Sequence, residues 1–429
     1  MNSKYILLIC ITLIMNSCAN DLKKVTNSDD YNNYLELAEN KTLLIAEKEV
    51  QFWKNKLDVQ PSQFPYMGKL AASYSQLFSA TGDIEALKKA EAYYLKVNEA
   101  TGYNDPQYIK GLAANYISQH RFKESLELLT KAELIGDNLD GTQKMLFDVH
   151  LELGNYELAK VYLDKFQDMS NFDYLIRLSK WSDHQGNLEA AIKYMEKAKR
   201  IAESSNLKSV KQWSYTNLAD FYGHAGNIKA SYDHYLKALA LDPNDAYAKK
   251  GIAWIVYSYE KNPDETLRIL NEVINSNRTP DYFLLKAEIA EFKGDFESKS
   301  KQLELYENAV KNNMYGEMYN AYNVSLHTDE FENYNKAISL AEQEVANRPT
   351  PASYDLLAWA HFKNGNVNEA SKIVTKHIEG KTFEPAILYH VAEIYKAQGQ
   401  LEKVQPIKEE LLASLYELGP LMTDKVTNL

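Results

Sequence analysis

Residues 212–245 read QWSYTNLADFYGHAGNIKASYDHYLKALALDPND. From Tyr215 onwards, large apolar residues recur every three or four positions, which predicts a helix with one apolar face. Gly226 marks a turn, because glycine tolerates backbone angles that other residues avoid. A second apolar pattern follows and runs to Pro243, which cannot continue a helix. The stretch therefore predicts two helices joined by a short turn, with the small Ala219 where their axes approach.

The same frame recurs along most of the chain. Units of 34 residues run without a gap over residues 212–313, and Gly365 and Gly399 stand 34 residues apart at corresponding turns. Weaker copies bring the total to about ten units over residues 62–418. One unit cannot bury its apolar face alone, so neighbouring units stack around a continuous core. The repeat therefore predicts one solenoid, not the three domains that the chain length alone would suggest.

This pattern resembles the tetratricopeptide repeat (TPR), which has large residues at positions 4, 7 and 11 and small ones at 8, 20 and 27. Ser231 takes position 20 and Ala238 position 27 of the quoted unit. In the unit at 246–279, Glu265 falls on position 20 unless one residue is inserted in the turn. The resemblance implies an all-α protein, a right-handed superhelical α-solenoid of about ten TPR helix pairs.

The two ends of the array need covers. Residues 31–61 have apolar side chains at helical spacing before Pro61, which predicts an N-terminal capping helix. The TPR solenoid then spans residues 62–418. Gly419 and Pro420 close it, which leaves a frayed C-terminal tail at 419–429.

The first residues resemble a bacterial lipoprotein signal. Lys4 precedes an apolar run, Tyr5 to Met15, that is shorter than the roughly 20 residues a spanning helix needs. Met-Asn-Ser-Cys follows and ends at Cys18, similar to the lipobox of such proteins. The resemblance implies that residues 1–17 are a signal peptide. An ordinary secretory signal with two incidental cysteines, Cys10 and Cys18, is the alternative.

Lipidation would fix the location of the chain. Cys18 would carry acyl chains such as palmitate and anchor the protein without a spanning helix, and residues 18–30 would form a polar tether. Ala19 follows in place of the Asp that retains enteric lipoproteins at the inner membrane. We therefore expect a lipid-anchored protein of the bacterial cell envelope, at the outer membrane, on its periplasmic or surface face.

Composition and motifs argue against several function classes. The net charge of −11 disfavours nucleic-acid binding, which needs clustered cations. The nucleotide, zinc-protease and serine-hydrolase motifs are absent, so we expect no enzyme, no catalytic residues and no cofactor. His120, His184 and His224 lie beside turns in different repeats, too far apart to share one metal ion, and we expect them to be solvated.

The TPR resemblance also implies a binding surface. In that family, positions 2, 5, 9 and 12 of each first helix line a concave groove that binds extended peptides. Exposed Trp and Tyr in such a groove are typical of binding hot spots. The expected partner-binding residues are Trp213, Asp220, Tyr247, Lys250, Trp254, Tyr257, Tyr319, Tyr322, Trp359 and Phe362. The alternative is that a tightly wound superhelix, or the chain's own terminal helix, covers them.

The expected function is a non-enzymatic scaffold that binds a protein or peptide in this groove. Chaperone-binding TPR proteins hold a C-terminal carboxylate with Lys at position 5 and Asn at position 9; Thr216 and Asp220 stand there instead, so that clamp is not expected. Two alternatives stay open beside a less favoured enzyme of unrecognised kind. One is a nutrient- or glycan-binding surface lipoprotein with TPR-like helices, and the other is an assembly factor for outer-membrane proteins or secretion machinery.

Overall fold

The computed structural model of the protein describes residues 24–36, 39–205 and 207–429. These residues form ten antiparallel helix pairs, so the predicted all-α solenoid of about ten pairs is confirmed. The pairs are α3 (Phe64–Thr81) with α4 (Ile84–Ala100), α5 (Pro106–Ser118) with α6 (Phe122–Ile135), α7 (Leu139–Glu152) with α8 (Tyr156–Lys165), α9 (Phe172–His184) with α10 (Leu188–Ser204), α11 (Lys208–His224) with α12 (Ile228–Leu241), α13 (Ala246–Trp254) with α14 (Pro263–Ser276), α15 (Asp281–Phe292) with α16 (Phe296–Val310), α17 (Asn320–Asp329) with α18 (Tyr334–Asn347), α19 (Pro351–Lys363) with α20 (Val367–Ile373), and α21 (Pro385–Ala397) with α22 (Leu401–Ala413).

Small residues let the two helices of a pair approach closely. Ala219 in α11 and Ser231 in α12 are both fully buried. In other pairs the hydroxyl at such a contact donates to the main chain of the partner helix, as Ser125 Oγ does to the carbonyl of Ala113 at 3.1 Å. A larger side chain at these positions would have no space, because protein interiors are closely packed.

The sixth pair contains the inserted residue that the sequence left open. After α13 the chain forms a π-helix, η1 (Ile255–Tyr259), in which the N–H of Glu260 donates to the carbonyl of Ile255. A π-turn holds one residue more than an α-turn. Position 20 therefore falls on Thr266, which is fully buried, and Glu265 is displaced from the packing position.

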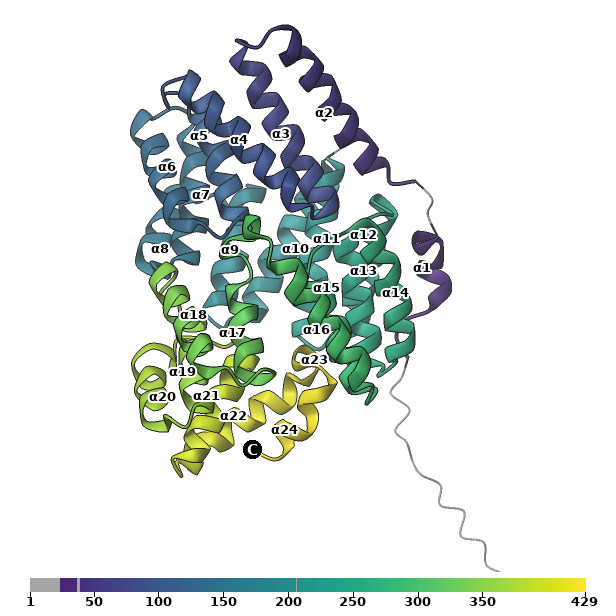
Figure 1. The fold of residues 1–429 in the computed structure, drawn as a ribbon, viewed down its shortest axis with the longest axis vertical. Coiled ribbons are helices and arrows are strands. Elements are labelled where there is room, and N and C mark those ends of the chain that lie inside the picture. Colours follow the sequence, from purple (N-terminus) through teal and green to yellow (C-terminus); the bar gives the residue numbers. More distant parts are fainter. Residues whose placement is uncertain (1–23, 37–38, 206) are drawn as a thin grey trace, which may run out of the picture.

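The solenoid is wound so tightly that early repeats touch late ones. Figure 1 shows α18 returning next to α8, and Arg348, directly after α18, lies 3.8 Å from the carboxylate of Glu152 in α7. The main-chain N–H of Arg278 donates to the carbonyl of Thr81, and Lys123 Nζ donates to the carbonyl of Ala346, 223 positions away. Contacts of this kind join successive superhelical turns, so the array is not held by nearest-neighbour contacts alone.

The N-terminal segment differs from the expected single capping helix over residues 31–61. It contains two helices, because Asn40 caps a new one: α1 (Ser28–Leu35) and α2 (Lys41–Val59). α2 packs on α3 and covers the end of the array, whereas α1 packs on α12 and α14. Tyr31 of α1 is buried there, with its hydroxyl 2.6 Å from the Glu265 carboxylate.

Both ends of the described chain are more ordered than expected. In the expected tether, the N–H groups of Val25 and Thr26 both donate to the Glu260 carboxylate, at 2.8 and 2.6 Å. The expected frayed tail at 419–429 is folded into η4 (Pro420–Met422) and α24 (Thr423–Thr427), after the short helix α23 (Leu415–Leu418). Val426 is fully buried and α24 packs on α22, which explains the order. No helix within the described residues is long and apolar enough to cross a membrane.

A candidate partner-binding groove

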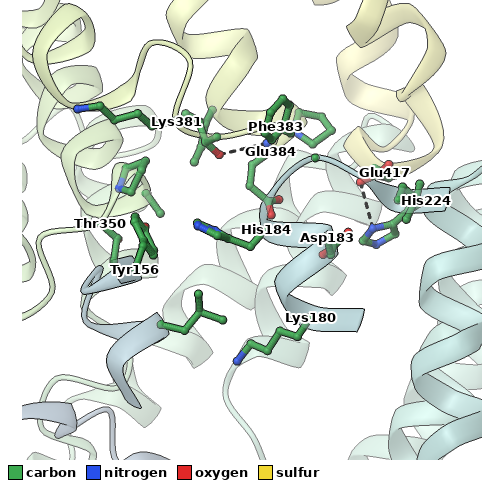
Figure 2. A pocket seen from close by; sticks show the side chains of 18 of the residues that line it. Tyr156, Lys180, Asp183, His184, His224, Thr350, Lys381, Phe383, Glu384 and Glu417 are labelled. Carbon is green, nitrogen blue, oxygen red and sulfur yellow. Dashed lines mark hydrogen bonds and ion pairs between the residues drawn. The ribbon is translucent and has the colours of Figure 1, made fainter. Parts of the chain in front are cut away.

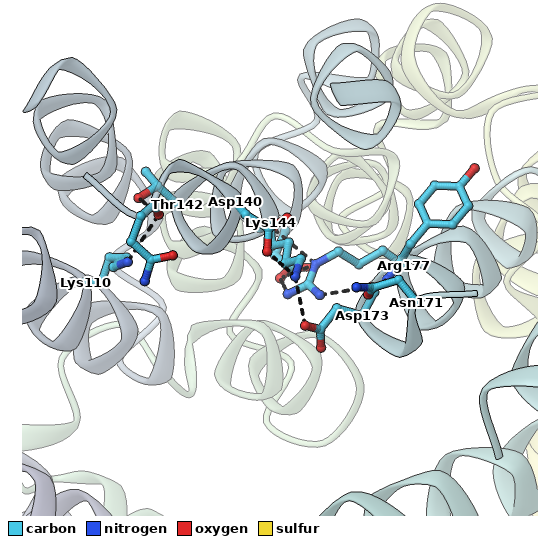
Figure 3. A network of polar contacts seen from close by, with 10 residues as sticks. Lys110, Asp140, Thr142, Lys144, Asn171, Asp173 and Arg177 are labelled. Carbon is cyan, nitrogen blue, oxygen red and sulfur yellow. Dashed lines mark hydrogen bonds and ion pairs between the residues drawn. The ribbon is translucent and has the colours of Figure 1, made fainter. Parts of the chain in front are cut away.

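The first helices of the repeats carry a ladder of ion pairs between neighbours. Lys144 Nζ lies 2.9 Å from the Asp173 carboxylate, which belongs to the next repeat (Figure 3). Arg177 Nη2 lies 2.7 Å from the Asp148 carboxylate, which belongs to the repeat before. Both contacts join the first helix of one repeat to the first helix of the next, so they link neighbouring repeats.

The expected groove residues fall into a covered set and an open set. Tyr257 is fully buried, and Tyr319 and Trp359 are each only 8% exposed. Trp213, Tyr247 and Tyr322 are 41%, 55% and 47% exposed. Aromatic side chains contribute to partner binding only where a partner can reach them, so the two sets have different roles.

Packing against neighbouring repeats covers Trp359 and Tyr319. The Trp359 ring stacks on His390 at a centroid distance of 4.0 Å, and its Nε1 donates to the Asp329 carboxylate at 3.0 Å. Phe362 stacks on the same indole and is half-buried. Tyr319 packs edge-on against Tyr315. The expectation that Trp359 and Tyr319 line an open groove is therefore wrong, because His390 of the next repeat covers Trp359, and Tyr306 of the preceding repeat packs on Tyr319.

The chain's own C-terminal segment covers Trp254. Trp254 Nε1 donates to the main-chain carbonyl of Tyr416 at 3.2 Å, and Ser258 Oγ donates to the same oxygen at 2.6 Å. Tyr257 lies beneath, with its ring 5.7 Å from that of Trp254. We call this part of the groove, formed by Trp254, Ser258 and Gly223, the Trp254 subsite. The expectation of an exposed Trp254 and Tyr257 is wrong, and the alternative of a covering terminal helix is correct here.

The open set lies on the first helices α11, α13 and α17, and the adjoining α15 contributes Asp281. The Tyr247 hydroxyl donates to the Asp220 carboxylate of the preceding repeat at 2.7 Å, which links the two repeats. Lys250 Nζ lies 2.7 Å from the Asp281 carboxylate of the following repeat. Burial raises the pKa of Tyr322, with the charge of Asp281 adding to the rise and Lys250 opposing it. We call Trp213, Tyr247, Lys250, Asp281 and Tyr322 the open face of the groove.

A cavity of about 760 Å³ adjoins the open face. It lies between α2 and α3 on one side and the loops after α12 and α14 on the other, and Tyr247 and Lys250 form part of its wall. Its other polar walls are amides, carboxylates and hydroxyls, among them Gln76, Asn244 and Asp242. The cavity extends the open face with a polar recess large enough for a side chain or a small ligand.

A second cavity of about 480 Å³ lies where two superhelical turns meet (Figure 2). His184 projects into it and packs on the Tyr156 ring at 4.2 Å. Burial lowers the pKa of His184 and of His120, so these two are not the solvated turn histidines expected from the sequence. The space between turns closes around them.

Carboxylates converge at one edge of this second cavity. Burial raises the pKa of Asp183, Glu384 and Glu417, and mutual repulsion among the three adds to the effect for Glu384 and Glu417. His224 opposes the rise, and its Nδ1 lies 3.7 Å from Glu417. No cluster of His, Cys, Asp or Glu in the described part of the chain has the arrangement of a metal site. The three carboxylates come from α9, from the residue before α21 and from α23, so the cluster lies where these segments meet.

Sequence reasoning did not find the residues that close the groove. Tyr416 and Gly419 form the cover of the Trp254 subsite, and both lie in the segment that follows the tenth helix pair. The sequence identified Gly419 only as a residue that ends the solenoid. The signal that could have found the cover was the tyrosine three positions before Gly-Pro, directly after the last repeat.

The lipid-anchor prediction lies outside the described residues. Cys18 and residues 1–17 belong to the segment 1–23, of which the structure gives no description.

Comparisons with known proteins find the same repeat. A family model described as "Tetratricopeptide repeat" matches residues 172–205 and 214–245, which correspond to α9–α10 and α11–α12. A curated relative, "TPR repeat-containing protein MJ1428" of Methanocaldococcus jannaschii, is 25% identical over 316 residues, or 68% of this chain and 53% of the relative. The chain thus spans about half the length of the curated relative that it matches.

Solved structures of low sequence identity also match. A human IFIT1 dimer with m7Gppp-AAAA is 13% identical, with a TM-score of 0.46, over 73% of this chain and 70% of that one. A structure of Pseudomonas aeruginosa pilF is 16% identical, with a TM-score of 0.37, over 50% of this chain and 96% of that one. Neither likeness assigns a ligand or a partner to this chain.

Proposed function

We propose that this chain, which carries tetratricopeptide repeats, is a non-enzymatic scaffold that binds a protein or peptide partner through the open face of its groove. The observation that carries the proposal is the exposure of Trp213, Tyr247 and Tyr322 on neighbouring first helices, beside the Lys250–Asp281 ion pair. Large aromatic side chains that a partner can reach are enriched in protein-binding hot spots.

We further propose that Cys18 anchors the scaffold to a membrane of the bacterial envelope. Lys24, where the described chain begins, lies six positions after Cys18, which is a span of at most about 20 Å when extended. α1, directly after that point, packs on the second helices α12 and α14. The first helices carry the open face. A short anchor would therefore hold the second-helix side toward the membrane and leave the groove accessible.

Site-specific photo-crosslinking on membranes tests the binding proposal. A photoreactive phenylalanine analogue at Tyr247 is expected to form adducts with a defined partner, which mass spectrometry then identifies. The matched control is the same analogue at Phe296, which is 64% exposed but lies on the second helix α16. Equal adducts at both positions, or adducts at 296 only, would place the partner on another surface.

The cavity beside Tyr247 favours a second candidate, the binding of a small polar nutrient such as a glycan. Its amides and carboxylates could pair with hydroxyl groups, and the exposed Tyr247 ring could cover the apolar face of a sugar. Thermal-shift screening with mono- and oligosaccharides tests this candidate. A ligand that raises the melting temperature of the wild type but not of Tyr247→Ala would support it, and no shift with any sugar would remove it.

A further inference from the structure

Residues 415–422 occupy the Trp254 subsite in the way that a bound peptide would. Two groove side chains, Trp254 and Ser258, donate hydrogen bonds to one main-chain carbonyl of the segment, that of Tyr416. Main-chain recognition of this kind is open to many sequences, because every residue presents a carbonyl. The inference concerns the same groove as the proposed function and rests on it only for the assignment of that groove as a binding surface.

The Tyr416 side chain is the anchor of the segment. Its ring packs against Gly223 of α11, where an added Cβ would stand 2.9 Å from the ring carbon Cε1. Gly223 is itself buried, in the middle of the last turn of a helix where alanine would be the better helix former. The glycine therefore leaves the recess that accepts the phenol.

Gly419 lets the segment leave the groove. Its φ of 81° lies in the left-handed region, which glycine adopts without strain. A Cβ at this position would also stand 3.1 Å from the Trp254 ring and 3.0 Å from the Glu288 carboxylate. Both the backbone angle and the available space require glycine three residues after the tyrosine.

The fit of the segment is incomplete, which allows its release. Burial raises the pKa of Glu417, next to the anchor; repulsion from Glu384 and Asp183 adds to the rise, and His224 opposes it. Glu288 is held beneath Gly419 with a pKa raised to about 7 by burial, with Glu291 adding to the rise and Lys425 opposing it. Docking thus places carboxylates where their charged forms are disfavoured.

We propose that residues 415–422 are an internal ligand of the Trp254 subsite, and that a protein partner binds there by displacing them with a segment of the same chemistry. That chemistry is a helical turn with a tyrosine three residues before a glycine. The subsite is then held closed at rest. The partner must overcome a tethered competitor, whose effective concentration is of the order of a millimolar.

A labelled peptide with the sequence of residues 413–429 tests the proposal without the natural partner. It is expected to bind the wild-type chain weakly, because the tethered copy competes. Tyr416→Ala weakens the tethered copy and is expected to raise affinity for the peptide at least about tenfold. Adding Gly223→Ala to that variant is expected to abolish peptide binding, because the new methyl group fills the recess for the tyrosine ring. Helix α11 should stay intact, because alanine is a better helix former than glycine.

Each result decides the question once circular dichroism shows that the variants are folded. Equal peptide affinity for the wild type and Tyr416→Ala, or no binding by Tyr416→Ala while hydrogen exchange shows residues 415–422 released, would overturn the proposal. Should Tyr416→Ala not fold, Gly419→Ala takes the place of that variant in the experiment, because it releases the segment at the Gly419 contact. Because the readout uses only the peptide, a failure here leaves the crosslinking result at Tyr247 to decide the proposed function separately.

Discussion

The indole Nε1 of Trp254 donates a 3.2 Å hydrogen bond to the main-chain carbonyl of Tyr416, 162 positions further along the chain. This bond joins the sixth helix pair to the segment that follows the tenth. It shows that the groove is not one continuous open surface. One part is filled by the chain itself, and the other, around Tyr247, faces solvent.

Replacing Trp254 should therefore affect folding. Trp254→Ala is expected to lower the free energy of unfolding by about 3 kcal/mol, because the side chain packs in the large core cluster and covers Tyr257. Urea denaturation measures this. Trp213→Ala, on the exposed part of the groove, should cost less than about 1 kcal/mol. Equal stability of Trp254→Ala and the wild type would mean that the C-terminal segment does not dock there.

Docking of the C-terminal segment should weaken as the pH rises. In the docked state the pKa of Glu288 is about 7, whereas in the released state the carboxyl regains water and its ordinary, lower pKa. The docked state therefore binds the proton more tightly and is favoured at low pH. The free-energy cost of docking, which comes from burying the ionised Glu288, grows as the pH rises from about 4.5 and reaches its full size above about 7.

Hydrogen exchange of residues 415–422 at pH 5 and pH 8, corrected for intrinsic exchange rates, checks this dependence. Protection should be greater at pH 5. Glu288→Gln is expected to flatten the profile, with Glu417 left to supply a weaker dependence of the same sign. Greater protection at pH 8 in the wild type would contradict the assignment of Glu288.

The features that could be predicted from the sequence are those that depend on residues close together in the chain. Ala219, Gly226 and Pro243 define one helix pair by local spacing, and the frame slip at Glu265 indicated the inserted residue that the π-helix η1 contains. Such features follow from packing between adjacent helices, and the residue spacing within each 34-residue repeat reflects that packing. This is why the number and order of the helix pairs could be predicted.

The cover over the groove could not be predicted in the same way. Whether Tyr416 contacts Trp254 depends on the rotation of each repeat relative to the next, added up over several repeats. Local residue spacing does not determine that total rotation. The same holds for His184, which looks solvated within its own repeat and is enclosed only when Phe383 returns beside Gly186. The sequence therefore identified the groove positions but not which of them stay open.

Ala219→Glu should damage the middle of the array first. Ala219 is fully buried between α11 and α12, and a charge there costs several kcal/mol. Hydrogen exchange is expected to rise most in α9 to α14 and also in residues 415–422, which pack against α11. The pairs α3–α4 and α5–α6 should respond less. A uniform rise through every pair would show that the contacts between superhelical turns make the chain one cooperative unit.

Anchoring depends on a single residue. Cys18→Ser is expected to release the protein from the membrane fraction or to leave an unprocessed precursor, because Cys18 is the proposed acyl acceptor. Metabolic labelling with a fatty acid followed by fractionation measures both outcomes. Label that persists in Cys18→Ser would rule out this residue as the lipid site.

The affinity of the crosslinked partner for an open-face double variant tests the central claim most directly. Tyr247→Ala with Tyr322→Ala is expected to keep the melting temperature, since both side chains are about half exposed. It should weaken binding by at least about 2 kcal/mol, or roughly thirtyfold, as measured by isothermal titration calorimetry. Phe296→Ala, the matched exposed aromatic on α16, should bind like the wild type. Unchanged affinity of the folded double variant would contradict the account and move the partner off the open face.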